Sequence, residues 1–255
     1  MSVRGSVAPA AVAIALLAGC TPAAGDAGAA TPVFVPASPS KSAAAAPEPR
    51  PEKITYPAQG AEAFTAAEGE PAGERQGTLL RYRVLVEKDI KGISAGTFAD
   101  AVRTTLADPR GWTAGGDLSF RRVGRGRPHD FTVYLVTPGT RDVLCQDAGD
   151  GYTSCRNGDK VVLNVARWAN GVPGYRAGLR VYRQYLVNHE VGHRLGHGHE
   201  LCPGKGRPAP VMQQQTLGMH GCTPNSWPYR DGERYAGASG AYEDEVPPRE
   251  GASKP

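Results

Sequence analysis

The stretch HEVGHRLGHGH occupies residues 189–199. Its first two histidines, His189 and His193, are four residues apart, so on an α-helix their imidazoles lie on one face and can bind the same metal ion. Glu190 lies beside this face, where its carboxylate can take a proton from a water near the metal. The stretch therefore predicts a helix that carries two metal ligands and a general base.

The third ligand is predicted to be His199 rather than His197. His197 lies eight residues after His189. On a continuous helix this is about 12 Å along the axis, whereas a Zn–N bond is only about 2.0–2.1 Å long. The helix must end first, and Gly196 is the expected place because glycine adopts the left-handed conformation that terminates helices without steric cost. The chain can then turn back and bring His199 to the metal.

The helix that carries this site is predicted over residues 175–195. Its apolar face repeats at the three- and four-residue spacing of a helix, in the series Leu179, Tyr182, Leu186, His189 and His193. Because the histidines share the face that must be buried, we expect them to point into a core or cleft.

Strands and one further helix precede the metal-binding helix. Alternating or apolar runs predict strands over residues 79–87, 118–123, 131–136 and 161–165. A helix is expected over residues 94–106 with Ser94 as its N-cap, and residues 141–156 are expected to form a loop or hairpin. This order predicts one α/β (α+β) domain in which a sheet packs on the metal-binding helix.

The start of the chain has the features of an export signal. Residues 1–19 combine Arg4 with an apolar run, and the run ends in a sequence similar to a bacterial lipobox immediately before Cys20. A lipidated Cys20 would anchor the protein to the outer face of a membrane. The alternative is an ordinary cleaved signal that leaves a secreted protein.

Two further segments are poor in large apolar residues. Residues 20–75 are rich in Ala and Pro and are expected to be a disordered tether, and residues 231–255 are expected to be a disordered tail, because neither can bury enough surface to offset its ordering entropy. The folded domain is therefore predicted over residues 76–230.

Four cysteines remain after Cys20. An even number in an exported protein indicates disulfides, and four cysteines allow three pairings. We favour the two local pairings, Cys145–Cys155 and Cys202–Cys222. Thiolate ligation of zinc is disfavoured, because the chain contains no Cys-x-x-Cys.

The formal net charge is +4 and the sequence pI is about 8.8. The surplus of basic residues is small and spread along the chain, so it does not indicate a nucleic-acid partner.

The motif in residues 189–199 resembles that of the metzincin zinc metalloproteases. The surrounding strings NHEVGHRLGHGHELCPG and APVMQQQT are also similar to a family of secreted actinobacterial lipoproteins of unassigned function. Over residues 76–230 the resemblance implies a single metzincin-like catalytic domain, with a twisted, mostly parallel sheet packed on the active-site helix. It also implies a methionine turn at Met212. Several metzincins place a tyrosine two residues after that methionine, where this chain has Gln214.

The implied function is that of a zinc-dependent endopeptidase acting outside the cell. One catalytic Zn²⁺ bound by His189, His193 and His199 would activate a water, and Glu190 would be the general base. The resemblance implies a peptide or protein substrate that lies extended along an edge strand near residues 141–156. The alternatives are a zinc hydrolase of a non-peptide, cell-wall bond and a catalytically inactive surface binding protein. The expected partners are the substrate and, through Cys20, the membrane; the protein is expected to be a monomer.

Overall fold

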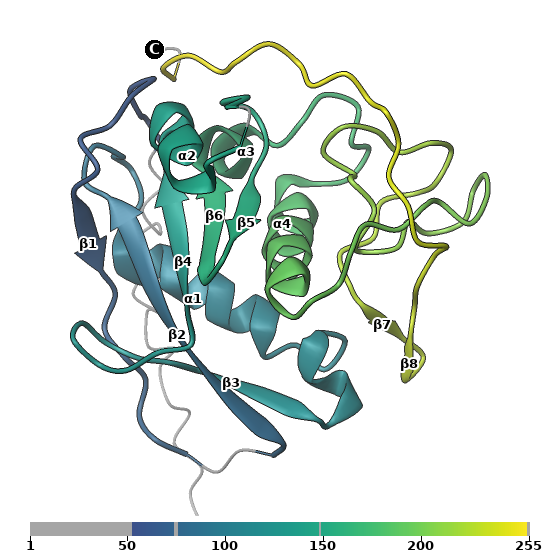
Figure 1. Cartoon of the computed structure of the whole chain (residues 1–255), viewed down its shortest axis with the longest axis horizontal. Coiled ribbons are helices and arrows are strands. Elements are labelled where there is room, and N and C mark those ends of the chain that lie inside the picture. The colour runs from purple at the N-terminus through teal and green to yellow at the C-terminus, as the bar shows by residue number, and fades with distance from the viewer. Residues whose placement is uncertain (1–52, 74–75, 148, 254–255) are drawn as a thin grey trace, which may run out of the picture. The chain divides into compact units, whose positions relative to one another are not determined.

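Three parallel strands form the centre of a mixed sheet in the computed structural model, which describes residues 53–73, 76–147 and 149–253 (Figure 1). These strands are β2 (Thr78–Glu87), β4 (Phe131–Val136) and β6 (Lys160–Asn164). The strand β1 (Phe64–Ala66) adds antiparallel to one edge and β5 (Cys155–Asn157) adds antiparallel to the other. The sixth strand, β3 (Leu118–Arg122), pairs in parallel with the first half of β2.

The larger part of the core lies on one face of this sheet. The helices α1 (Ala95–Leu106) and α4 (Leu179–Arg194) cover that face with side chains such as Phe98, Val102 and Leu186, all of which are buried. Ser94 caps α1, because its Oγ accepts a hydrogen bond from the amide of Thr97 at 3.0 Å. The helix α4, which carries the histidine motif, therefore packs on a mostly parallel sheet, and this confirms the predicted fold class.

A smaller apolar cluster lies on the opposite face. The helix α2 (Pro138–Cys145) covers the carboxyl-terminal half of the strands there, and the cluster includes Val136, Val162 and Cys145. Two short elements complete this half of the chain: the 3-10 turn η1 (Trp112–Gly115) follows α1, and the helix α3 (Val165–Asn170) follows β6.

The prediction of a loop or hairpin over residues 141–156 was only partly right. Residues 155–157 do form a hairpin strand with β6, but the segment begins inside α2. Thr137 caps this helix and Pro138 occupies its first turn. Proline is tolerated at that position because its missing N–H would be unpaired anyway. The pair Pro138–Gly139 therefore begins a helix here instead of interrupting one.

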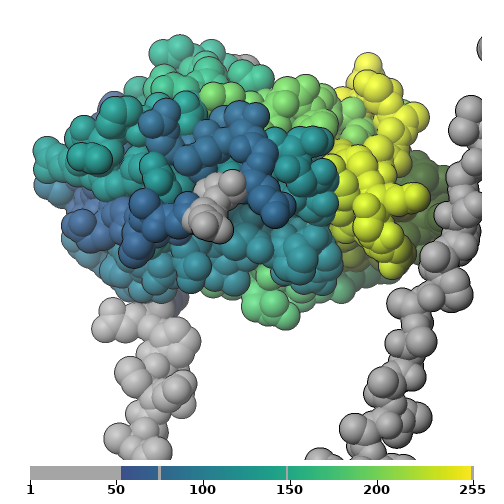
Figure 2. Space-filling view, turned by 90° about the horizontal axis from the view of Figure 1, so that it is seen from below, coloured from purple at the N-terminus to yellow at the C-terminus, as the bar shows by residue number. Residues whose placement is uncertain are grey.

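Parts of the two segments that were predicted to be disordered are ordered in the structure. Residues 53–73, within the predicted tether, include β1, and residues 231–253, within the predicted tail, follow the surface of the domain. Figure 2 shows the C-terminal residues in yellow, packed against the body of the domain. The tail begins with a short hairpin of β7 (Tyr229–Arg230) and β8 (Glu233–Arg234).

Hydrogen bonds attach both segments, and in the first of them Tyr56 and Ala67 also lie in the main core. The amide of Ala67 donates to Val84 O at 3.0 Å, and the amide of Leu201 donates to Ala238 O at 2.8 Å. A composition criterion measures only the apolar surface that a segment can bury, so it does not detect this kind of attachment. The predicted signal (residues 1–19) and Cys20 lie outside the described residues.

Both predicted disulfides, Cys145–Cys155 and Cys202–Cys222, are present, with Cα–Cα distances of 6.0 and 5.9 Å. The first joins α2 to β5, and two such bridges indicate an oxidising compartment. In the described ranges, no helix is both long enough and apolar enough to span a membrane.

Candidate metal centre

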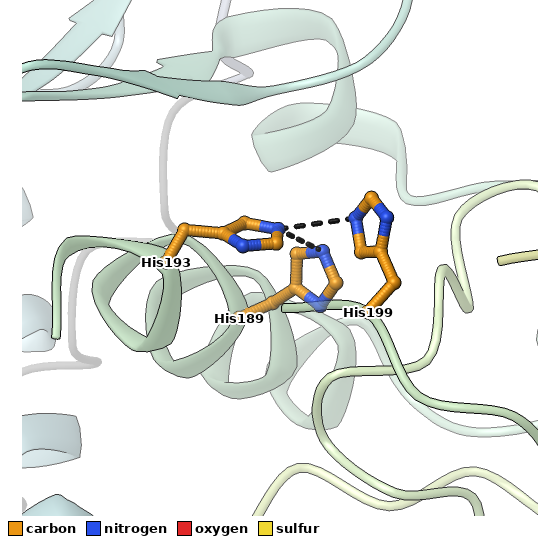
Figure 3. A group of neighbouring side chains, drawn as sticks. All are labelled: His189, His193 and His199. Atoms are coloured by element: carbon orange, nitrogen blue, oxygen red, sulfur yellow. Dashed lines mark hydrogen bonds between the residues drawn. The ribbon is translucent and has the colours of Figure 1, made fainter. Parts of the chain in front are cut away.

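Three histidine nitrogens meet at the end of α4 (Figure 3). The Nε2 atom of His193 lies 3.2 Å from His189 Nε2 and 3.1 Å from His199 Nε2. Two imidazole nitrogens bound to one tetrahedral zinc at about 2.0–2.1 Å are about 3.3–3.4 Å apart. The triad predicted from the sequence is therefore brought together at a spacing that fits one metal ion.

Two backbone carbonyls fix which nitrogen of each helix histidine carries the proton. The Nδ1 atom of His189 lies 2.9 Å from Val211 O, and the Nδ1 atom of His193 lies 2.9 Å from His197 O. A carbonyl can only accept, so both Nδ1 atoms donate and both Nε2 atoms carry a lone pair. Such carbonyl partners are typical of histidines that bind metals.

The converging lone pairs need a positive charge between them. Burial is the main cause that moves the pKa of His189 well below its ordinary value, and His193 lowers it further. Burial and then His193 also lower the pKa of His199 to about 4. A proton is thus disfavoured at the centre, whereas a divalent cation satisfies the lone pairs. Imidazole donors suit zinc and several other first-row metals.

Gly196 ends α4 in the way that its place in the motif predicts. Its φ is +94°, and the amide of His197 donates to Gly192 O at 3.0 Å while the amide of Gly196 donates to His193 O at 3.1 Å. These two bonds define a Schellman motif, with Gly196 as the left-handed residue. The reversal directs His197 away from the other histidines, where its ring stacks on Trp112 at 4.5 Å, and it brings His199 back to His189 and His193.

A buried turn supports the centre from below. Met212 is fully buried, and the peptide before it supplies the Val211 carbonyl that holds His189. A Cβ atom on Gly192 would lie 2.4 Å from Met212 Sδ and 2.6 Å from Trp112 Cζ2. Gly192, inside the motif, is therefore required for the close approach of α4 to this turn. Sequence reasoning missed this role, although the glycine between the two histidines was visible.

Glu190 lies in the same cavity as the three histidines, which has a volume of about 340 Å³. Its side chain is buried, and its Oε2 atom has no hydrogen-bond partner among the described residues. Burial raises the pKa of Glu190 to about 8, and the positive charge of Arg141 opposes the rise. A buried, unpartnered carboxylate beside a candidate metal site is a typical feature of a functional centre.

The wall of the cavity opposite α4 depends on Arg141, a residue that was not expected to have a role. Its guanidinium is buried and uses all five N–H groups. It donates to Thr153 O at 3.1 Å, to Asp142 at 2.9 Å, to both oxygens of Asp147 at 2.7 Å and to Thr153 Oγ1 at 2.9 Å. Asp150 lies 3.3 Å away. This cluster fixes the loop that follows α2 as one side of the cavity.

Gln214 occupies the position, two residues after Met212, at which several metzincins have a tyrosine. Gln214 lines the cavity, and its Oε1 atom is buried without a partner in the described part of the chain. Tyr185 lines it too, but its hydroxyl donates to Gln213 O at 3.1 Å. His220 contacts Asp244 at 2.8 Å and is not part of the lining.

The fold and the histidine triad together define an α/β protein with a candidate metal centre. The chain belongs to the family described as "Protein of unknown function (DUF3152)", whose model matches residues 50–225, more than half of the chain. No curated protein and no solved structure matches the chain.

Proposed function

We propose that this protein is a zinc-dependent endopeptidase of the metzincin type that acts outside the cell. One observation carries the proposal: three histidine nitrogens converge in the same cavity as the buried carboxyl group of Glu190, whose Oε2 atom has no partner among the described residues. A purely structural zinc site usually fills all four positions with protein ligands and needs no such carboxylate.

His189, His193 and His199 would hold the zinc. When bound, zinc supplies Lewis acidity, which polarises a carbonyl and makes a water more acidic. Glu190 takes the proton from the attacking water and delivers it to the leaving amine. A bound dication also lowers the pKa of Glu190 from its value in the metal-free site, because a nearby positive charge favours the carboxylate. Met212 serves as the methionine turn beneath the centre, and Gln214 is the cavity residue best placed to donate to the substrate carbonyl.

The setting of this activity is also proposed from the sequence. The lipobox-like run before Cys20 supports export and lipid anchoring to the membrane, and the two disulfides support an oxidising compartment. The substrate is then a peptide or protein outside the cell, and the enzyme acts as a monomer.

Cleavage of an unbiased peptide library by the zinc-loaded full chain tests the proposal, with Glu190→Gln measured in parallel and the zinc content determined for both. We expect cleavage by the wild type and a loss of about 10²- to 10⁴-fold in kcat/KM for the variant, at equal zinc content. Equal rates in the two proteins would exclude Glu190 as the general base. Absence of cleavage at full zinc occupancy would exclude a general endopeptidase and favour a non-peptide bond or a binding role.

A further inference from the structure

The C-terminal segment is fixed to both sides of the catalytic cavity. On one side, Asp244 Oδ2 lies 2.8 Å from His220 Nε2, in the loop that follows the methionine turn. On the other side, Arg249 donates to Gly149 O at 3.2 Å, and the amide of Glu250 lies 3.4 Å from Gly151 O. Glycines 149 and 151 belong to the loop that Arg141 organises. We call residues 244–250 the strap.

The middle of the strap lies at the mouth of the cavity. Val246 lines the cavity together with the three metal-site histidines and Glu190, and its side chain is 43% exposed. Pro247 and Pro248 line an adjoining cavity of about 640 Å³, which shares Thr216 and Leu217 with the catalytic one. The strap therefore runs between the two walls, and Figure 1 shows the same segment passing along the surface toward the end of the sheet near α2 and α3.

The strap has a stiff backbone, and its two ends are attached with different strength. Two consecutive prolines fix the backbone φ beside Val246, so this part of the segment resists collapse into the cavity. The anchor of Asp244 to His220 is a partly exposed pair, which contributes little. At the other end, Arg249 pairs with Asp142, and Glu250 pairs with the buried guanidinium of Arg167. A further contact, from the Ser253 amide to Tyr56 O at 2.9 Å, holds the end of the segment beyond the strap. The Asp244 end is therefore the weaker attachment of the strap.

We propose that the strap narrows the mouth of the catalytic cavity and restricts the site to extended, unfolded segments of a substrate chain. This inference rests on the proposed peptidase function. A single extended chain can pass beside Val246 to reach Glu190, whereas the surface of a folded protein must first displace residues 244–250. The family model matches residues 50–225, so both cavity walls belong to the matched region and the strap does not.

Three variants test the strap. The first is a chain that ends at Gly240, which retains the backbone bonds from Leu201 to Ala238 and from Gly240 to His199 O. The second, Asp244→Ala, removes only the anchor to His220. The third, Glu245→Ala, is the matched control, because it removes the same charge from the next residue, which is exposed and has no ion pair among the described residues.

Two measurements are made on each zinc-loaded protein. The first is kcat/KM for a globular test protein in its native form and in its reduced, alkylated, unfolded form. The second is the rate at which dipicolinate removes the metal, which requires access to the site but no catalysis. We expect truncation to raise kcat/KM for the native form and the rate of metal removal by at least about fivefold, as for a site that is accessible only a fraction of the time. Asp244→Ala should change both by about two- to fivefold in the same direction, and Glu245→Ala should change neither.

The outcomes distinguish a failure of the strap proposal from a failure of the peptidase proposal. Faster metal removal in the truncated chain and in Asp244→Ala, without cleavage by any protein, would support the strap and contradict the proposed peptidase. Cleavage by all proteins with unchanged substrate preference and unchanged metal removal would support the peptidase and overturn the strap. Asp244→Ala decides the matter if the truncated chain does not fold.

Discussion

The two walls of the cavity that contains the histidine triad are held together by different forces. On the α4 side, neutral imidazoles are fixed by the backbone carbonyls of Val211 and His197. On the opposite side, the buried guanidinium of Arg141 is fixed by three carboxylates and by Thr153. Among the described residues the first wall contains no ion pair, whereas the second is an ionic cluster closed by the Cys145–Cys155 bridge.

This difference teaches that metal affinity and stability depend on separate residues. His199 lies beyond the end of α4 and is only partly buried, so its removal should create neither a large cavity nor an unpaired charge. The Arg141 cluster contributes no metal ligand, but a broken buried ion pair is costly because it leaves charges without partners. A substitution in the histidine wall should therefore change the zinc affinity, whereas a substitution in the Arg141 wall should change the free energy of unfolding.

His199→Ala should give the largest effect, on metal binding alone. The zinc affinity is expected to fall by more than about a hundredfold, because loss of a direct ligand exceeds the 10- to 100-fold cost of losing an outer partner. The free energy of unfolding of the zinc-free protein should change by less than about 0.5 kcal/mol, because the side chain is only partly buried. Competition with a zinc indicator and urea denaturation measure the two quantities. His197→Ala is the control, and equal loss of affinity there would contradict the ligand assignment.

Arg141→Met should have the opposite effect: it should lower the free energy of unfolding and leave the zinc affinity almost unchanged. We expect the free energy of unfolding to fall by about 2–3 kcal/mol, less than for a fully buried pair, because the carboxylates remain partly solvated. The zinc affinity should change by less than about threefold, since no metal ligand is disturbed. Arg156→Met removes the same charge from an exposed residue of the same wall, which has no ion pair in the described structure. A loss of stability in both variants would indicate a general charge effect rather than the cluster.

Gly192→Ala sharpens the comparison, because it acts on the support beneath the α4 wall. The added methyl group would overlap Met212 Sδ and Trp112, and overpacking of this kind costs about 1–3 kcal/mol. Urea denaturation of the zinc-free protein measures the change. Gly198→Ala is the matched control in the same motif, since a Cβ there has no atom within 4 Å. Equal stability of the two variants would show that α4 can move away from the methionine turn at little cost.

The sequence revealed one wall and not the other, for a physical reason. The three histidines, Glu190 and Gly196 lie within eleven residues, where helix periodicity places the first two histidines on one face and the glycine predicts the turn that returns the third. The Arg141 cluster depends instead on how a loop folds back on α2, and its residues carry no regular spacing. The strap was missed for a similar reason, because its contacts join residues that are far apart along the chain, such as His220 and Asp244 or Gly149 and Arg249. Periodicity predicts neither kind of contact.

Asp147→Asn should give the smallest change in the free energy of unfolding, and this change should depend on pH. Burial is the largest single influence and would raise the pKa of Asp147, but the hydrogen bonds from Arg141 and from the Gly149 amide, together with the positive charge of Arg141, outweigh burial and lower it. A carboxylate with a lowered pKa stabilises the folded protein above its unfolded pKa of about 3.9, and the contribution disappears as the pH falls through the folded value. The Asp147 side chain is 45% exposed, so the loss of stability in the variant should be below about 1 kcal/mol at pH 7.

That difference between Asp147→Asn and the wild type should vanish at pH values below the folded pKa, whereas the exposed control Asp159→Asn should match the wild type throughout. Urea denaturation of the zinc-free proteins between pH 7 and pH 2 tests this. A difference that persists at the acid end would mean that Asp147 acts through its shape and hydrogen bonds rather than its charge. In that case the wall opposite α4 would be held by neutral contacts, as the wall formed by α4 and the histidines is. The contrast between the two walls would then disappear.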